Sequence, residues 1–368
     1  MNTRVKLVNL LVTRRCNLRC DYCYVLPGGT EDMSLDTAKR AVEDAFRRDA
    51  EDFDRLEFAF LGGEPMLCFP MIRALSEWMW AGSWPKPYLL TASSNGTCLT
   101  DESRRWLYEN RGRFKISLSY DGSPDAQDRH RCGSAARVDL SFFRETWPDM
   151  PIKLTASEDG VDHLADDIIR LRESGFLVDD TIADGTPPWR ESSLEALDEQ
   201  LRKLCEYDLA HPGARPSRLL NVDLMPMLSG RTGDSFSCGA GHGQVTYDWA
   251  GRLWRCHLLS PLALTDAQLA RLETDLARGP ARPAGCETCP LDPVCPTCGA
   301  NAFRRHQTCW RREERICGLF RRQLRWACVF WAKRLLRADV PEEERRLRLR
   351  AVTHAMSALM RLDTQIRN

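Results

Sequence analysis

The chain has 368 residues, and its 52 Lys and Arg balance its 52 Asp and Glu, so the formal net charge is zero. Nothing in this overall balance therefore points to nucleic acid or to an anionic membrane, and no apolar stretch approaches the roughly 20 residues that span a bilayer. Sixteen Cys, in a long chain that starts without a signal-peptide pattern, indicate metal binding or catalysis in the cytoplasm rather than a disulfide scaffold.

Strand and helix patterns alternate through the first two thirds of the chain. Short apolar runs predict strands, and apolar residues three to four positions apart predict helices. The expected strands are 5–12, 56–61, 88–93, 114–119, 152–156 and 176–182. The expected helices are 34–48, capped by Ser34, 70–79, 101–110, 161–174 and 194–209. About six such repeats predict an α/β fold with a parallel sheet, a partial (β/α)6 TIM-like barrel.

The pattern changes beyond about residue 230. Regular periodicity is expected there only in a hairpin over 243–255 that turns at Ala250-Gly251, while Cys and Pro become frequent. Such a loop-rich segment buries little apolar surface, so bound metal would supply the missing cross-links. The segment 341–367 predicts a C-terminal helix with a solvated, Arg-rich face. Its expected apolar face consists of Leu347, Ala351, Ala355, Leu359 and Leu362.

The most specific pattern is CNLRCDYC, which lies directly after the first strand. Its thiols, Cys16, Cys20 and Cys23, have CxxxCxxC spacing and can hold three irons of a [4Fe–4S] cluster. Such a cluster ordinarily takes four Cys ligands, so one iron stays open to a small molecule. A zinc loop or three core thiols is the alternative, but zinc sites usually combine two CxxC-type pairs.

The triad, the strand before it and the aromatic residue before the last Cys together resemble the signature of the radical S-adenosylmethionine enzymes. The resemblance covers about the first 220 residues, and 236–320 is similar to the twin-cluster extension called SPASM. It implies a radical S-adenosylmethionine domain over 1–225, a small Cys-rich SPASM domain over 226–330 and a helical tail over 331–368. The implied cofactors are three [4Fe–4S] clusters and S-adenosylmethionine, with a flavodoxin- or ferredoxin-type protein as electron donor.

Further motifs of the first domain carry the resemblance. The GGEP segment after the second strand is similar to the family's glycine motif, whose carboxylate binds the methionyl amino group and whose glycines let the backbone approach the ligand. The implied cofactor-binding residues are Tyr22, Gly62, Gly63, Glu64, Pro65, Ser119 and Arg131. An ordinary strand-to-helix turn is the alternative for GGEP, and a surface charge is the alternative for Arg131. The turn 94–97 matches the family's third-strand turn but receives no ligand role.

Eight late cysteines follow the SPASM order, enough for two Cys₄ clusters. By resemblance, the outer cluster is held by Cys286, Cys289, Cys295 and Cys317. The inner cluster is held by Cys238, Cys256 and Cys298, with Cys309 as the candidate fourth ligand. Cys295 and Cys298 lie one residue closer together than is usual in the family, and no second Cys follows Cys238 closely, so a pair of zinc knuckles stays an alternative. The cysteines expected to fill the core are Cys68, Cys98, Cys132, Cys205 and Cys328.

The resemblance also implies a reaction. One-electron cleavage of S-adenosylmethionine gives a 5′-deoxyadenosyl radical that abstracts hydrogen from the substrate, and the protein orients and shields it. Auxiliary clusters imply oxidative modification of a ribosomal peptide or protein side chain, such as a crosslink. His257 stands where sulfatase-maturing members carry an Asp that acts as general base. His257 is therefore either the candidate general base or a structural residue.

Other functions stay open at this point. One is a small-molecule dehydrogenase of the same family, and another is a sulfatase-maturase-like enzyme. A non-enzymatic iron–sulfur electron carrier or zinc adaptor is the third, although a carrier has no use for an open iron. The substrate, the bond formed, the recognition of a leader peptide and the oligomeric state are not given by the sequence.

Overall fold

The computed structural model describes residues 4–48, 53–183, 189–230, 238–278, 286, 288–296, 298–311, 314–337 and 340–367. The chain divides into two compact units. Unit 1 consists of Met1–Tyr120, Pro124–Lys153 and Cys238–Ala277, and unit 2 consists of Asp121–Ser123, Leu154–Ser237 and Arg278–Asn368. Each unit therefore combines segments that are distant in the sequence. The functional division at residues 225 and 330 stays a prediction.

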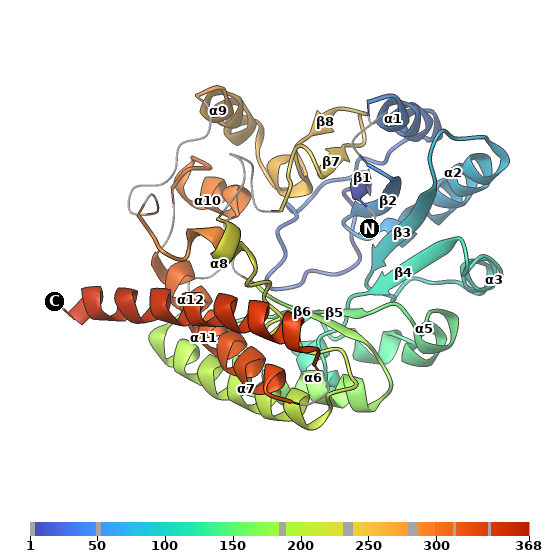
Figure 1. Cartoon of the computed structure of the whole chain (residues 1–368). Coiled ribbons are helices and arrows are strands. Elements are labelled where there is room, and N and C mark those ends of the chain that lie inside the picture. The colour runs from blue at the N-terminus through green and yellow to red at the C-terminus, as the bar shows by residue number, and fades with distance from the viewer. Residues whose placement is uncertain are drawn as a thin grey trace. The chain divides into compact units, whose positions relative to one another are not determined.

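A six-stranded sheet forms the centre of unit 1 (Figure 1). Its order is β4-β3-β2-β1-β7-β8, and β8 is antiparallel to β7 while the other neighbours are parallel. Its strands are β1 Val5–Thr13, β2 Arg55–Gly62, β3 Tyr88–Ser94, β4 Phe114–Leu118, β7 Gln244–Tyr247 and β8 Leu253–Trp254. This parallel sheet confirms the predicted α/β class, and the strands that the structure describes do not close into a barrel.

Side chains alternate between the two faces of the sheet along each strand, so Phe58 and Phe60, two positions apart, lie on the same face. Phe58 and Phe60 of β2 are fully buried on it, and burial of one such side chain stabilises the fold by about 1.5–3 kcal/mol. Phe46 packs on Phe58, with 5.4 Å between the ring centroids, and Trp106 packs on Phe114 at 5.5 Å. The helices of unit 1 are α1 Leu35–Arg48, α2 Phe69–Ala81, α3 Asp101–Glu109, α4 Pro124–His130, α5 Leu140–Thr146 and α9 Asp266–Ala277, with 3-10 turns at Pro65–Cys68, Ala135–Arg137 and His257–Leu259.

The remaining predicted strands are β5 Ile152–Ala156 and β6 Val178–Ile182, which pair in a two-stranded sheet. Ser119, one residue beyond β4, forms an isolated parallel bridge with Lys153 of β5. The six predicted strands and five helices of the first 210 residues all occur, with ends within about three residues of the prediction. The hairpin also occurs, and it joins the free edge of β1 through β7.

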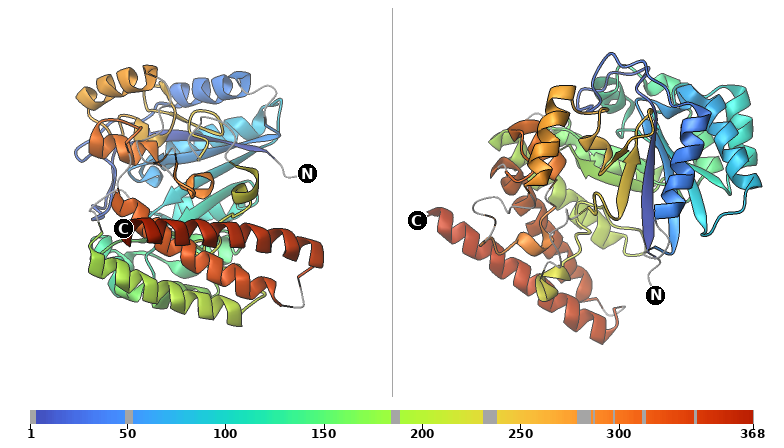
Figure 2. Two further views of the ribbon diagram at one scale, coloured as in Figure 1. Left: turned by 60° about the vertical axis from the view of Figure 1, so that its left-hand side comes forward. Right: turned by 90° about the horizontal axis from the view of Figure 1, so that it is seen from above.

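Unit 2 is built mainly from helices. They are α6 Leu164–Glu173, α7 Glu191–Ala210, α8 Pro226–Ser229, α10 Gly299–His306, α11 Glu314–Leu335 and α12 Glu342–Arg367, with 3-10 turns at Val161–His163 and Asp292–Val294. The helix α12 runs beside α11 (Figure 2), and Ala351, Ala355 and Leu359 share a buried core with Leu324. Leu347, which the sequence placed on the same face, is 44% exposed. That assignment is wrong because Leu347 lies outside this shared core.

Five described helices fall outside the predicted set: α4, α5, α8, α9 and α10. The helix α11 contains the run 326–331 around Cys328, which the sequence indicates as an apolar helix. Four of the five have only four to eight residues, too few for a clear helical period. The fifth, α9, buries only Leu272 and Asp275, so its amphipathic signal is weak. The expectation that periodicity disappears beyond residue 230, apart from the hairpin and the C-terminal helix, is therefore wrong. None of the described helices is long and apolar enough to cross a membrane.

Candidate functional site

The cysteine loop, residues 16–23, begins three residues after the end of β1. Cys16 and Cys23 are exposed and Cys20 is half-buried, whereas Leu18 between them is only 6% exposed. The Leu18 N–H donates to Cys16 Sγ over 3.4 Å, and the Cys23 N–H donates to the Cys20 carbonyl over 3.2 Å. The loop is thus anchored by its apolar residue, and it presents its thiols at or near the surface.

Gly62 and Gly63 fasten the end of β2 to the segment that leads into the cysteine loop. The Gly63 N–H donates to the Thr13 carbonyl over 2.9 Å, and the next N–H donates to the Arg15 carbonyl over 2.8 Å. A Cβ atom on Gly62 would lie 2.1 Å from Thr13 O, and one on Gly63 would lie 2.2 Å from Arg15 O. Because both obstacles are backbone, only glycine fits. In the sequence, these glycines are expected because the backbone approaches the ligand closely. The structure adds a second reason, since the backbone of Thr13 and Arg15 leaves no room for a Cβ atom.

Glu64 is 1% exposed, yet its carboxylate accepts three hydrogen bonds. Oε1 accepts from the Met66 N–H at 3.0 Å and from the Ser94 hydroxyl at 2.8 Å, and Oε2 accepts from the Asn95 N–H at 2.7 Å. Burial raises the pKa of Glu64, while these bonds and the charge of Arg131 oppose that rise. A cationic ligand beside the carboxylate would offset the burial penalty.

The turn after β3 supports both Glu64 and the cysteine loop. Besides holding the carboxylate, Asn95 donates from Nδ2 to Asn17 Oδ1 over 2.9 Å. Asn17 in turn donates to Thr97 Oγ1 over 2.7 Å. This turn receives no ligand role from the sequence, but in the structure it supports Glu64 and the cysteine loop. Its signal is the run of Ser, Asn, Gly and Thr at a strand end, residues that favour local side-chain hydrogen bonds.

Arg131 interacts with Tyr22 of the cysteine loop and with Glu64. It is only 6% exposed, which rules out the surface-charge alternative. Its guanidinium lies 5.4 Å from the centroid of the Tyr22 ring, and its charge acts on the Glu64 carboxylate. Ser119 is half-buried, and its N–H donates to the Ser94 carbonyl over 2.8 Å. Arg131 thus interacts with two other predicted cofactor-binding side chains, and Ser119 is tied to the turn that holds Glu64.

His257 lies directly after Cys256 in unit 1. Its Nδ1 is buried without a hydrogen-bond partner in the part of the chain that the structure describes. The Tyr24 ring lies beside the imidazole, with 5.3 Å between centroids. Burial, and then the charge of Lys153, lower the pKa of His257 to about 4. The imidazole is therefore neutral near pH 7, and it is a weaker base than the unperturbed value suggests.

The late cysteines are distributed over both units. In unit 1, burial raises the pKa of Cys256 to about 11, and the neighbouring Cys238 adds to that rise. In unit 2, the Cys289 N–H donates to the Cys286 carbonyl over 3.1 Å. Cys295, 6% exposed, belongs to the core of α11 and α12. The other three late cysteines of unit 2 are Cys298 and Cys317, both half-buried, and Cys309, which is buried.

A site for a single metal ion is absent from the described residues, because no three Cys, His, Asp or Glu converge on one point. Of the cysteines expected in the core, Cys68, Cys205 and Cys328 are buried. Cys98 is half-buried and Cys132 is exposed, so the expectation is wrong for Cys132.

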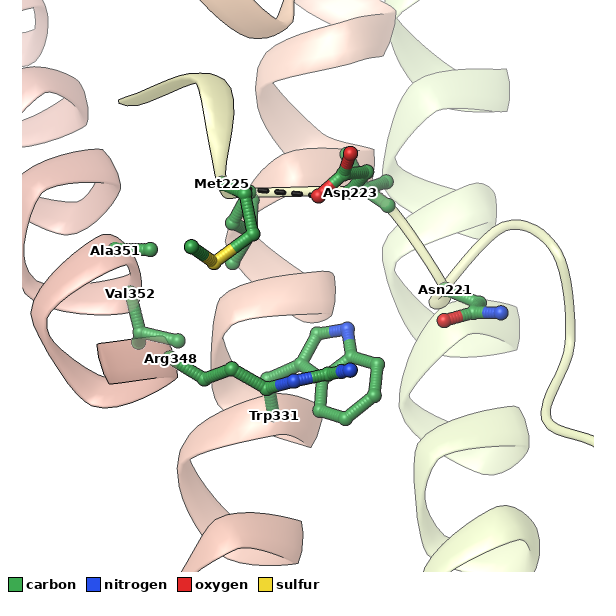
Figure 3. Close-up of a pocket in the computed structure, with 9 residues that line it drawn as sticks. Asn221, Asp223, Met225, Trp331, Arg348, Ala351 and Val352 are labelled. Atoms are coloured by element: carbon green, nitrogen blue, oxygen red, sulfur yellow. Dashed lines mark hydrogen bonds between the residues drawn. The ribbon is translucent and has the colours of Figure 1, made fainter. Parts of the chain in front are cut away.

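A separate cavity of about 270 Å³ lies in unit 2 (Figure 3), lined by 221–225 and by residues of α11 and α12. The Arg348 guanidinium lies over the Trp331 ring, 4.9 Å from its centroid. On the opposite wall, Asp223 Oδ1 accepts from the Met225 N–H at 3.0 Å. None of the predicted site residues lines this cavity, so it is not part of the candidate site.

No family model matches the chain. An uncharacterized protein of Methanocaldococcus jannaschii is 38% identical over 69 residues, 19% of this chain and 23% of that protein. The tungsten-containing aldehyde ferredoxin oxidoreductase cofactor-modifying protein of Pyrococcus furiosus is 32% identical over 131 residues, 34% of this chain and 33% of that protein. The chain therefore matches at most a third of the length of these two curated relatives. The GTP 3′,8-cyclase of Mycolicibacterium smegmatis is 24% identical over 291 residues, 72% of this chain and 74% of that protein.

Two solved structures share the fold. An anaerobic sulfatase-maturating enzyme with bound S-adenosylmethionine and a peptide aligns with 88% of this chain and 96% of its own, with a TM-score of 0.66 and 17% identity. SuiB of Streptococcus suis, bound to its precursor peptide SuiA, aligns with 86% of this chain and 76% of its own, with a TM-score of 0.54 and 13% identity. The chain thus shares the fold of these two enzymes, and the fold that the resemblance implies is confirmed.

Proposed function

We propose that this chain is a radical S-adenosylmethionine enzyme with auxiliary clusters, which oxidatively modifies a side chain of a ribosomal peptide or protein. One observation carries the proposal. The cysteine loop meets a buried, hydrogen-bonded carboxylate, Glu64, with Arg131 and Tyr22 beside it. The two structural neighbours, each solved with a peptide, support the proposed substrate class.

The residues fit the implied cofactors. Cys16, Cys20 and Cys23 would hold a [4Fe–4S] cluster with one open iron, because they lie on one short loop with their thiols at or near the surface. Glu64 would pair with the ammonium group of S-adenosylmethionine, since a cation offsets the burial of its charge. When bound, these cofactors supply the one-electron chemistry that removes a hydrogen atom from the substrate.

The other residues of the site would bind and orient. Tyr22 would pack on the adenine side, and Arg131 and Ser119 would contact the polar groups of the cofactor. Gly62 and Gly63 would hold Glu64 in place, as their backbone contacts with the segment before the cysteine loop suggest. Pro65 would fix the turn that begins directly after Glu64. His257 is kept as the candidate proton acceptor.

The auxiliary clusters of this proposal use eight thiols. The outer set is Cys286, Cys289, Cys295 and Cys317, and the inner set is Cys238, Cys256, Cys298 and Cys309. Two Cys₄ sets account for all eight. Deprotonation of Cys256 would accompany metal binding, because metals bind thiolates and burial disfavours the free thiolate. The flavodoxin- or ferredoxin-type donor and the cytoplasmic location stay predictions.

A small-molecule substrate is the second candidate. The relative named GTP 3′,8-cyclase favours it, because its similarity extends over 72% of this chain. The two candidates differ in what the enzyme changes, so they can be separated by mass measurement.

Iron content and cofactor cleavage test the proposal. Full-length protein, reconstituted without oxygen, is expected to bind about twelve irons, four for each of three clusters. Replacing Cys16, Cys20 and Cys23 by Ala should remove about a third of the iron and all cleavage of S-adenosylmethionine. Cys205→Ala, a buried thiol outside the motifs, is the matched control and should change neither. Full iron content in the triad variant would overturn the proposal.

The substrate class is tested by anaerobic co-expression with short peptides encoded near the gene. A mass change in one peptide that depends on the triad supports a peptide substrate. Modification of a small molecule, with every peptide unchanged, supports the second candidate instead.

A further inference from the structure

Three consecutive residues at the end of α4, here called the loop clamp (130–132), contact the cysteine loop in both gaps between its cysteines. In the gap between Cys20 and Cys23, the Asp21 N–H donates to the His130 carbonyl over 3.2 Å. The His130 imidazole, 3% exposed, hydrogen-bonds through Nδ1 to Asp21 Oδ2 at 2.7 Å. The first clamp residue thus holds both the backbone and the side chain of the residue that follows Cys20.

The third clamp residue holds the residue that precedes Cys20. Cys132 Sγ donates to the Arg19 carbonyl over 2.9 Å and accepts from the Arg19 N–H over 3.3 Å. One thiol therefore satisfies both backbone groups of a single loop residue. With the His130 contacts, the peptide groups on either side of Cys20 are fixed from the same segment, 109 to 113 residues further along the chain.

The backbone at Cys132 is in the left-handed region, with φ of 56°. The helix α4 ends two residues earlier, at His130, and the Gly133 N–H donates back to the Asp128 carbonyl over 2.9 Å. Helix ends of this kind usually place glycine in the left-handed position, because a Cβ atom there costs roughly 1–2 kcal/mol. Among the described residues, Gln307 at 58° is the other non-glycine with positive φ. At Cys132 the strained position directs a thiol onto the Arg19 peptide.

The middle clamp residue, Arg131, connects the cysteine loop to the carboxylate of Glu64. Arg131 lies over the Tyr22 ring at 5.4 Å, and its charge acts on Glu64. The three consecutive residues therefore contact three loop positions, Arg19, Asp21 and Tyr22, and bring a charge to the group expected to bind the cofactor.

We propose that Cys132 and His130 are positioning residues that hold the cysteine loop, and with it the Cys20 thiol, in its ligating shape before the cluster binds. The inference rests on the proposed function for the identity of the cluster. It assigns the Cys132 thiol to backbone hydrogen bonds and not to iron. Fixing the loop beforehand lowers the conformational entropy lost on binding.

Cys132→Gly tests the inference, because it relieves the left-handed strain and removes only the thiol contacts. In the full-length protein without clusters, amide hydrogen exchange at residues 19–21 should become faster by roughly ten-fold, the effect of about 1.4 kcal/mol of lost hydrogen bonding. In the reconstituted protein, a chelator should remove the third of the iron that depends on the triad faster by a similar factor. The melting temperature should not fall.

Gln307→Gly is the matched control. It relieves the same strain at the end of α10, where the side chain donates to the Phe303 carbonyl over 3.5 Å, and it should leave both rates unchanged. Cys132→Ser, whose hydroxyl donates and accepts, should restore part of the protection. His130→Asn keeps a donor at the position of Nδ1, whereas His130→Phe does not, so only His130→Phe should loosen the loop.

The outcomes of these experiments separate the proposed loop clamp from the assignment of the cysteine triad to a cluster. Wild-type exchange at residues 19–21 in both Cys132→Gly and His130→Phe would overturn the clamp. Faster exchange with unchanged loss of triad iron would also overturn it, because the residues would then not act on the cluster. If exchange accelerates but the triad variant keeps all its iron, the clamp on the loop is supported and the cluster assignment fails.

Discussion

Replacing Glu64 by Gln perturbs the buried carboxylate at the centre of the candidate site. The two oxygens accept from Met66, Ser94 and Asn95. Gln offers one acceptor oxygen, so its NH₂ group must face either the Met66 N–H or the Asn95 N–H. One buried donor then loses its acceptor, which lowers the free energy of unfolding by about 1–3 kcal/mol. The loss should stay near the lower end, because Gln does not carry the charge that burial penalises.

The effect of the same variant on ligand binding should be larger. A hydrogen bond to a charged group contributes about 1.5–3 kcal/mol, so losing the pairing with the ammonium of S-adenosylmethionine should weaken binding by roughly 10- to 150-fold. The iron content should stay at the wild-type level, because Glu64 is not a cluster ligand. Anaerobic calorimetry gives the affinity, and urea unfolding gives the stability.

The matched control is Glu57→Gln on the same strand. Glu57 is half-buried and accepts from the Thr91 hydroxyl at 2.9 Å, so its replacement should leave the affinity unchanged. If Glu64→Gln is folded, carries full iron and binds S-adenosylmethionine as tightly as the wild type, the carboxylate does not bind the ammonium group and the reasoning is refuted.

Further outcomes are expected at the glycines, at a helix cap and at the candidate base. Gly63→Ala should lower the free energy of unfolding by about 1–3 kcal/mol, because its Cβ atom would lie 2.2 Å from a backbone oxygen. Gly112→Ala, with open space around its Cβ, should be neutral in the same urea titration, and equal values for both would contradict the steric argument. Asp139 caps the N-terminus of α5. Hydrogen bonds lower its pKa to about 2, and the bond from Ser141 has the largest effect. The stability advantage of wild type over Asp139→Asn should therefore be present above about pH 4 and disappear as the pH falls through about 2, and a constant difference would exclude this cause. His257→Ala should keep its iron and its cleavage of S-adenosylmethionine but form product more slowly, by on the order of 10²–10⁴-fold if the imidazole takes a proton. An unchanged rate would make His257 structural.

The sequence alone determines those local elements that have a clear pattern in contiguous residues. The helix α1 begins after Ser34, whose hydroxyl accepts from the Thr37 N–H at 3.1 Å, as a cap at that position predicts. The hairpin turns where Gly251 has a φ of 82°. The triad is equally local, since three thiols within eight residues need no tertiary information to be recognised. Period and spacing carry this information.

The tertiary structure decides which distant residues meet. Arg131 looks like one charge in a polar run, and only the fold buries it beside Tyr22. Cys132, a presumed core thiol in the sequence, is exposed and holds the peptide of Arg19, 113 residues away. The local pattern records whether a side chain is polar or apolar, but not its partner. Hydrogen bonds between distant segments depend on how the chain returns to the end of β1, and local periodicity does not encode that path.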